Sequence, residues 1–267
     1  MIPLSVLCVF YPGGIPFAAF AGAVSLIAAH EFYQGVRRLG AHPVEPVGLL
    51  AVALFVFSAR TYQIKEISSI FPAVLTLLLI VSFCIELIRR KRAPLVNVGA
   101  TVLGAIYVGW LIMHLVVLRG IHGTVTVGHY TGERGAWLVM LTLICTWACD
   151  SGAYFTGRFL GKTKIAPNLS PNKTFEGSLG GLAGSVIAGL ITGWLIIGLP
   201  WYHALALGSL LGVLCQLGDL SESAIKREIG VKDFGNIMPG HGGMLDRLDS
   251  LLFSGPMVYY YVVLFLR

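Results

Sequence analysis

Long apolar runs separated by polar loops are the feature that most constrains the fold of this chain. A helix that crosses a bilayer needs about 20 predominantly apolar residues, and several of the runs reach that length. Only 12% of the 267 residues are charged, against about 25% in a typical soluble domain. We therefore expect an all-α, polytopic integral membrane protein with about nine transmembrane helices. The expected spans are 2–11, 15–33, 47–57, 67–88, 94–118, 136–159, 178–199, 201–220 and 248–265.

Basic residues are distributed unevenly among the loops between these runs. If the N-terminus is cytoplasmic, 14 of the 19 lysines and arginines fall on the inner side, as the positive-inside rule requires. This distribution predicts the N-terminus in, the C-terminus out, and both large polar loops on the cytoplasmic face. It also explains the net charge of +6 without nucleic acid as a partner. No basic segment precedes the first run, so we expect no signal peptide.

Glycine, cysteine and aromatic residues give expectations about packing. The 33 glycines suit closely packed membrane helices. All five cysteines fall in apolar runs, which indicates buried thiols and neither disulfides nor a zinc site. At the end of the second run, Glu31-Phe32-Tyr33 is expected to form an interfacial aromatic belt with one acid that reaches toward water.

The polar stretch 219–249 lies between two apolar runs and concentrates acids, bases and glycines. Ionisable groups beside hydrocarbon are costly unless they are paired, hydrated or bound to a metal. The spacing predicts a helix over 219–226 with Asp219, Glu222, Ser223 and Lys226 on one face. A second helix, preceded by the glycines at 240–243, is expected to carry Asp246 and Asp249 on one face.

Together these parts suit metal-assisted phosphoryl or nucleotidyl transfer. Glycine-rich backbone at a helix N-terminus favours phosphate, and carboxylates are the ligands that Mg²⁺ prefers. Lysine and arginine offset the charge of a polyphosphate. The alternative is an ordinary charged loop between two membrane helices.

A second polar stretch, 150–177, offers groups of the same kind. Asp150 lies within or at the end of the sixth run, where a carboxylate needs a partner. Ser170, Lys173 and Thr174 supply hydrogen-bond donors suited to phosphate, and Glu176 is expected to cap the next helix. The alternative here is an ordinary basic inner loop.

Both stretches resemble the signature of the CDP-diacylglycerol synthases, also called phosphatidate cytidylyltransferases. The longer match is Ser223-x-x-Lys226-Arg227-x-x-x-x-Lys232-Asp233, continuing to Pro239-Gly240-His241-Gly242-Gly243-x-x-Asp246-Arg247-x-Asp249. Met238 stands where the family has Leu, Ile or Phe. The shorter match is Ser170-Pro-x-Lys-Thr-x-Glu-Gly177. The resemblance implies a Mg²⁺-dependent membrane enzyme of phospholipid biosynthesis that converts CTP and phosphatidic acid to CDP-diacylglycerol and pyrophosphate.

The motifs assign candidate roles to individual residues. The expected catalytic residues are Asp219, Asp246, Lys226 and Arg247. The expected ligands of Mg²⁺ are Asp219, Asp246, Asp249 and Asp150, with a second metal ion left open. Substrate binding is expected of Ser170, Lys173, Thr174, Ser223, Arg227, Lys232 and His241. We place these roles in a C-terminal catalytic membrane domain, 135–267, which follows an N-terminal membrane-helix scaffold, 1–134.

The expected partners are CTP, phosphatidic acid and membrane lipids, and a homodimer is left open. The expected location is the plasma membrane or cell inner membrane, with the active site facing the cytoplasm. Two alternatives remain, a CTP-dependent lipid kinase and a transporter of an anionic solute. The long match over 223–249 argues against the kinase, and the lack of an internal repeat weakens the transporter. A CDP-alcohol phosphotransferase is excluded because the sequence holds no Asp-Gly-x-x-Ala-Arg string.

Overall fold

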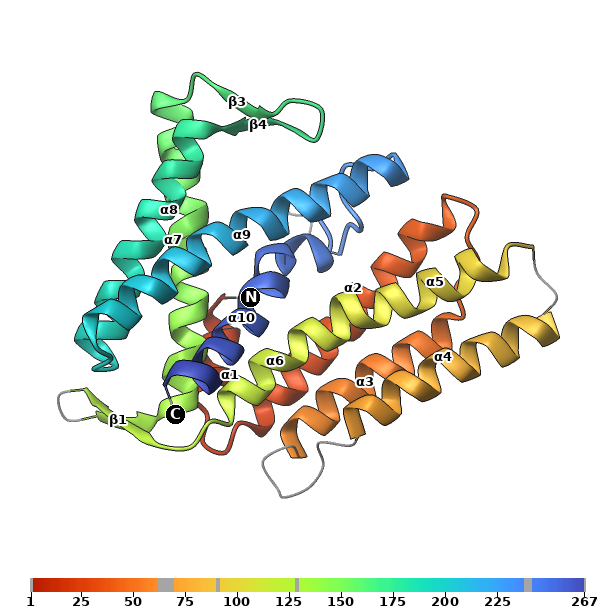
Figure 1. The fold of residues 1–267 in the computed structure, drawn as a ribbon, viewed down its shortest axis with the longest axis horizontal. Coiled ribbons are helices and arrows are strands. Elements are labelled where there is room, and N and C mark those ends of the chain that lie inside the picture. The colour runs from red at the N-terminus through yellow and green to blue at the C-terminus, as the bar shows by residue number, and fades with distance from the viewer. Residues whose placement is uncertain (1, 62–69, 90–91, 128–129, 238–241, 267) are drawn as a thin grey trace. The chain divides into compact units, whose positions relative to one another are not determined.

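The computed structural model describes residues 2–61, 70–89, 92–127, 130–237 and 242–266. Within these residues, every one of the expected apolar runs contains a helix (Figure 1). The helices are α1 (Ile2–Phe10), α2 (Ile15–Arg37), α3 (Glu45–Thr61), α4 (Ile70–Arg89), α5 (Pro94–Gly104), η2 (Ala105–Trp110), α6 (Leu111–Arg119), α7 (Arg134–Leu160), α8 (Phe175–Gly189), η3 (Leu190–Ile196), α9 (Trp201–Ile229), η4 (Leu245–Arg247) and α10 (Asp249–Phe265).

Six helical segments in the described part of the chain are long and apolar enough to cross a membrane. They are Ile15–Arg37, Ile70–Arg89, Pro94–Arg119, Arg134–Leu160, Phe175–Ile196 and Trp201–Ile229. The chain is therefore a helical, polytopic membrane protein, as expected. Helix α1 has 9 residues, and α3 and α10 have 17 each. Nine spans and the orientation of the termini stay predictions.

Two short antiparallel hairpins depart from the all-α expectation. Strand β1 (Thr124–Val127) pairs with β2 (Tyr130–Glu133), and β3 (Lys164–Ala166) pairs with β4 (Ser170–Thr174). Strand β1 reads Thr-Val-Thr-Val, and β-branched residues favour strands. Both segments were expected to be loops, because each is too short for a periodic pattern to stand out.

The chain folds into two compact units. The first comprises Met1–Pro12, Leu118–Ile225 and Asp249–Arg267, and the second comprises Gly13–Val117 and Lys226–Leu248. The division into a scaffold, 1–134, and a catalytic domain, 135–267, concerns roles and stays a prediction.

In the first unit, α7 and α8 run side by side, and the β3–β4 hairpin lies at one end of the pair (Figure 1). Glycine permits this close packing: a Cβ on Gly152 of α7 would lie 2.5 Å from the carbonyl oxygen of Gly180. Ser185 of α8 donates a hydrogen bond of 2.8 Å to the carbonyl of Gly208 on α9. The expected role of glycine in helix packing is thus confirmed at α7 and α8.

A buried arginine ties α1 into the first unit. Arg119 is 3% exposed, and its guanidinium donates to the carbonyl of Val9 over 2.7 Å and to that of Tyr11 over 3.0 Å. It also forms an ion pair with Glu133. These bonds satisfy carbonyls at the end of α1, which a short helix leaves without intrahelical donors.

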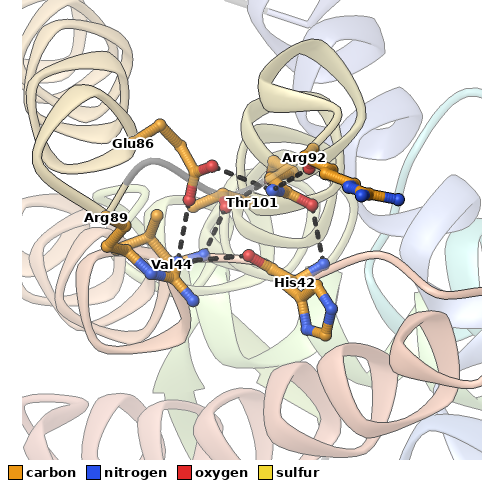
Figure 2. Close-up of polar contacts among 7 residues, drawn as sticks. His42, Val44, Glu86, Arg89, Arg92 and Thr101 are labelled. Carbon is orange, nitrogen blue, oxygen red and sulfur yellow. Dashed lines mark hydrogen bonds and ion pairs between the residues drawn. The ribbon is translucent and has the colours of Figure 1, made fainter.

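In the second unit, a polar network links the connection between α2 and α3 to α4 and α5 (Figure 2). Its members Glu86 and Asn97 are buried, whereas His42 and Arg89 are exposed. The Asn97 side chain accepts the His42 N–H over 2.7 Å and donates to Glu86 over 2.8 Å. Arg89 pairs with Glu86 over 2.9 Å and donates to the His42 carbonyl over 3.2 Å. The network pairs polar groups that would be costly to bury alone.

Two expectations about burial are wrong. Glu31, Phe32 and Tyr33 are 4%, 1% and 0% exposed and form no interfacial belt; the Tyr33 hydroxyl donates to the Thr101 carbonyl over 2.8 Å. Four of the five cysteines are buried, as expected, but Cys84 is exposed. Cys84 falls outside the stripe of α4 that is buried, which runs through Phe71, Val74, Leu78, Ser82 and Glu86.

Candidate functional site

The predicted site residues divide between the two units, and each set is described within its own unit. The first unit holds Asp150, Ser170, Lys173, Thr174, Asp219, Ser223 and Asp249. The second unit holds Lys226, Arg227, Lys232, Asp246 and Arg247. His241 lies outside the described residues, as do Met238, Pro239 and Gly240.

Thr174 and Glu176 shape the loop that carries the shorter motif. The Thr174 hydroxyl accepts the Gly177 N–H over 3.1 Å and is the N-cap of α8. Glu176 accepts the backbone N–H groups of Lys162 and Thr163 over 3.0 and 3.1 Å and so closes the base of the β3–β4 hairpin. Thr174, and not Glu176, is therefore the N-cap residue, while Glu176 lies in the first turn of α8, where its carboxylate also accepts its own N–H.

An ion pair joins the two polar stretches within the first unit. The Lys173 ammonium of β4 lies 2.6 Å from an Asp219 carboxylate oxygen of α9. Ser170 begins the same strand, and Ser223 is a buried residue one turn beyond Asp219. A predicted phosphate-binding cation and a predicted metal ligand thus lie next to each other.

Further carboxyl groups gather around Asp249 at the start of α10. The Asp249 carboxyl interacts electrostatically with those of Asp219 and Asp150 and contacts Glu222. A Cβ on Gly218 would lie 2.5 Å from the Asp249 carbonyl oxygen, so this glycine lets α9 and α10 meet. Glu222 is fully buried and received no role from the sequence. Its position on the same helix face as Asp219 was expected from the spacing and was the signal that could have given it a role.

The donors of the first unit suit a hard cation such as Mg²⁺. Asp150, Asp219 and Asp249 carry carboxylate oxygens, the ligand type that Mg²⁺ prefers, and a cation would relieve the electrostatic repulsion that Asp249 feels from the other two. Among the described residues, no three His, Cys, Asp or Glu side chains converge to enclose a metal ion. Mg²⁺ usually takes one or two carboxylates and completes its shell with water and phosphate. The arrangement therefore fits an open site that substrate completes.

Asp246 organises the loop of the second unit. One carboxylate oxygen lies 2.8 Å from the Lys226 ammonium. The other accepts the backbone N–H of Gly243 over 2.8 Å and that of Phe234 over 3.0 Å. The Asp246 and Lys226 side chains are 5% and 14% exposed, so the pair is largely shielded from solvent.

These contacts set the protonation state of Asp246. Burial raises the pKa of this carboxyl, but the Lys226 ammonium and the N–H groups of Gly243 and Phe234 outweigh burial. The pKa of Asp246 is therefore lowered from its usual value. The side chain is a carboxylate at neutral pH.

Asp246 and Asp249 do not share a helix face, so that expectation is wrong. Asp246 lies in the 3₁₀ turn η4, and α10 begins only at Asp249. The Leu248 N–H donates to the Leu245 carbonyl over 2.9 Å, the i→i−3 pattern of a 3₁₀ turn. The Gly243 N–H, expected to face a ligand, bonds Asp246 instead. The other three bases that were predicted for the site in this unit, Arg227, Lys232 and Arg247, are exposed.

The fold and these clusters define a polytopic helical membrane protein whose ionisable groups are gathered into paired acids and bases. The profile of the cytidylyltransferase family matches residues 1–265. The chain belongs to this family.

Bacterial relatives resemble the chain over most of its length. It is 36% identical to a phosphatidate cytidylyltransferase of Synechocystis sp., over 95% of this chain and 90% of the relative. It is 32% identical to the enzyme of that name from Bacillus subtilis, over 95% and 91%. It is 30% identical to the Staphylococcus aureus protein of that name, over 94% and 93%.

Proposed function

We propose that the chain is a phosphatidate cytidylyltransferase, which transfers CMP from CTP to phosphatidic acid and forms CDP-diacylglycerol and pyrophosphate. The supporting observation is that relatives named for this activity align with 94–95% of the chain. The membrane helices suit a lipid substrate, and the ionisable clusters suit a nucleotide triphosphate.

The reaction exchanges one phosphoanhydride bond for another. A phosphate oxygen of phosphatidic acid attacks the α-phosphorus of CTP and forms the new P–O bond. The bond from that phosphorus to the oxygen bridging the β-phosphate breaks, and pyrophosphate leaves with the electron pair. Such a transfer depends on positioning and charge stabilisation, so no side-chain nucleophile is required.

The bases and hydroxyls of both motifs are proposed to bind the phosphates. Lys173, Lys226, Arg227, Lys232 and Arg247 neutralise negative charge. The smaller polar residues orient the substrates, and these are Ser170, Thr174, Ser223 and His241. Asp219 pairs with Lys173, and Asp246 pairs with Lys226. These two ion pairs support the assignment of both aspartates to the catalytic machinery.

Mg²⁺ is the proposed cofactor, with Asp219, Asp249 and Asp150 of the first unit as its ligands and Asp246 as a further candidate. When bound, the ion supplies charge neutralisation at the phosphates. The Lys173 ammonium lies 2.6 Å from the Asp219 carboxylate, so it would add a second positive charge there beside that of Mg²⁺.

We further propose that the chain lies in the plasma membrane or cell inner membrane with its active site facing the cytoplasm. This proposal places the N-terminus in and the C-terminus out. It rests on the excess of lysine and arginine in alternate loops and on the need for cytoplasmic CTP.

Pyrophosphate release by the purified chain in detergent tests the proposal. Release should require CTP, phosphatidic acid and Mg²⁺ together. Asp219→Asn keeps the shape of the side chain but removes its charge, so it should insert normally and lose most activity. Pyrophosphate release that continues without phosphatidic acid, or near-normal turnover by Asp219→Asn at limiting Mg²⁺, would count against these assignments.

A further inference from the structure

Glu31 of α2 is a buried acid that the proposed reaction does not use. The residue is 4% exposed, and one of its carboxylate oxygens accepts the Leu245 N–H over 2.8 Å. The other oxygen, Oε1, has no hydrogen-bond partner among the described residues. A carboxylate buried in this way in an apolar helix is costly, so a specific role should explain it.

Two glycines of the loop leave room for the Glu31 carboxylate. A Cβ on Gly235 would overlap Oε1 of Glu31, and a Cβ on Gly243 would lie 2.5 Å from Oε2. Neither glycine has a positive φ; in the described part of this loop, 231–237 and 242–248, only Gly242 does, at +81°. Gly235 and Gly243 are therefore required because of the carboxylate they face and not because of their backbone conformation.

An apolar contact joins the same helix to the same loop. The Phe32 and Phe234 rings are 6.3 Å apart. A Cβ on Gly35, one turn beyond Glu31, would lie 3.0 Å from the Phe234 ring. Helix α2 thus holds the loop at two points, through Phe234 and through Leu245.

We infer that Glu31 is a positioning residue for the turn that carries Asp246 and Arg247. Leu245 is the first residue of η4, and Asp246 and Arg247 follow it directly. By holding the Leu245 N–H, Glu31 sets where this turn begins and so where the two motif side chains lie. The inference rests on the proposed function, because that function gives Asp246 and Arg247 their roles in CTP use.

The experiment compares Glu31→Ala, Glu31→Gln and the matched control Glu228→Gln. Glu228 is an exposed acid of the same unit. Alanine removes the acceptor, and the Leu245 N–H that is then left buried without a partner should lower kcat/KM for CTP by about tenfold or more. Glutamine keeps an acceptor oxygen, so it should stay within about threefold of wild type. The control should equal wild type. Glu31→Ala within twofold of wild type, or Glu31→Gln as impaired as Glu31→Ala, would overturn the inference.

A double-variant cycle with Gly235 separates positioning from a general loss of folding. The three atoms nearest to a Cβ on Gly235 all belong to Glu31. Gly235→Ala should therefore impair the wild type by about tenfold but change Glu31→Ala less than twofold, since neighbouring residues couple. Equal effects in both backgrounds would show that the contact plays no part in the working enzyme.

Amide hydrogen exchange supplies a readout that does not depend on activity. Exchange at Leu245 should accelerate in Glu31→Ala and stay slow in Glu31→Gln and Glu228→Gln. Unchanged exchange at Leu245 in Glu31→Ala would contradict the inference. A wild-type chain that does not turn over CTP would contradict the proposed function instead, and the exchange result would still decide the role of Glu31.

Discussion

Replacing Asp246 by asparagine probes the loop of the second unit most sharply. The carboxylate binds the Lys226 ammonium at 2.8 Å and accepts two backbone N–H groups, from Gly243 and Phe234. Asparagine has the same shape, but it carries no charge and replaces one acceptor oxygen with a donor. Either the ammonium or the two N–H groups must then face that donor.

The structure sets the size of the expected effect. Both side chains of the pair are largely buried, at 5% and 14% exposure. Removing one partner of a buried pair costs about 3–5 kcal/mol, and asparagine retains part of the hydrogen bonding. We therefore expect Asp246→Asn to lower the free energy of opening this loop by about 3 kcal/mol, roughly a hundredfold in the population of the open loop.

Amide exchange at Gly243 and Phe234 measures this opening directly. Both amides should exchange about a hundredfold faster in Asp246→Asn, whereas the exposed control Glu228→Gln should leave them unchanged. Lys226→Met should add little in the Asp246→Asn background, because the two residues share one interaction. Slow exchange of the Gly243 and Phe234 amides in Asp246→Asn would refute the role of the Asp246–Lys226 pair in holding this loop. So would effects of the two substitutions on the free energy of opening that add to within about 0.5 kcal/mol.

Acid should release the same loop. Because the pKa of Asp246 is lowered in the folded chain, its contribution to stability is present above the unfolded pKa, about 3.9. It is lost only as the pH falls through the lower folded value. Protection of the Gly243 amide should therefore persist at pH 5. Loss of protection between pH 7 and pH 5 would mean that Asp246 is not held as a carboxylate.

Three further predictions follow from the first unit and from the charge distribution. Thr174→Ala should destabilise the start of α8 by about 1 kcal/mol while Thr174→Ser retains the cap, and an equal loss of thermal stability in both would count against capping. Lys173→Met should weaken CTP binding because it removes the cation beside Asp219 that we propose binds phosphate, and an unchanged KM for CTP would refute that. In a cysteine-free background, Asn172→Cys and Asn236→Cys should react with an impermeant reagent only from the cytoplasmic side, and labelling from outside would break the proposed topology.

Local patterns predicted the helices well, because a helix depends on the spacing of nearby residues. The helix over 219–226 lies within α9, as its periodicity indicated. The pattern failed at Asp246, since a spacing of three residues fits a 3₁₀ turn followed by a new helix as well as it fits one continuous helix. Thr174 could have been identified as the N-cap, because threonine before an apolar helix is a common capping signal.

Sequence patterns could not predict contacts between residues that are far apart in the chain. Glu31 and Leu245 are 214 residues apart, and no periodicity links an acid in one apolar run to a turn at the other end of the chain. Lys173 and Asp219 were each identified as site residues, but their ion pair depends on how β4 packs beside α9. The sequence could therefore name the participants in the candidate site, while their pairing required the fold.

The fate of label from CTP tests the central claim most directly. The purified chain would be incubated in detergent with phosphatidic acid, Mg²⁺ and CTP labelled either at the α- or at the γ-phosphate. Transfer of CMP predicts that the α-label enters the lipid fraction and the γ-label leaves as pyrophosphate. Entry of the γ-label into lipid would identify a lipid kinase, and absence of both labels from lipid would contradict the proposed enzyme.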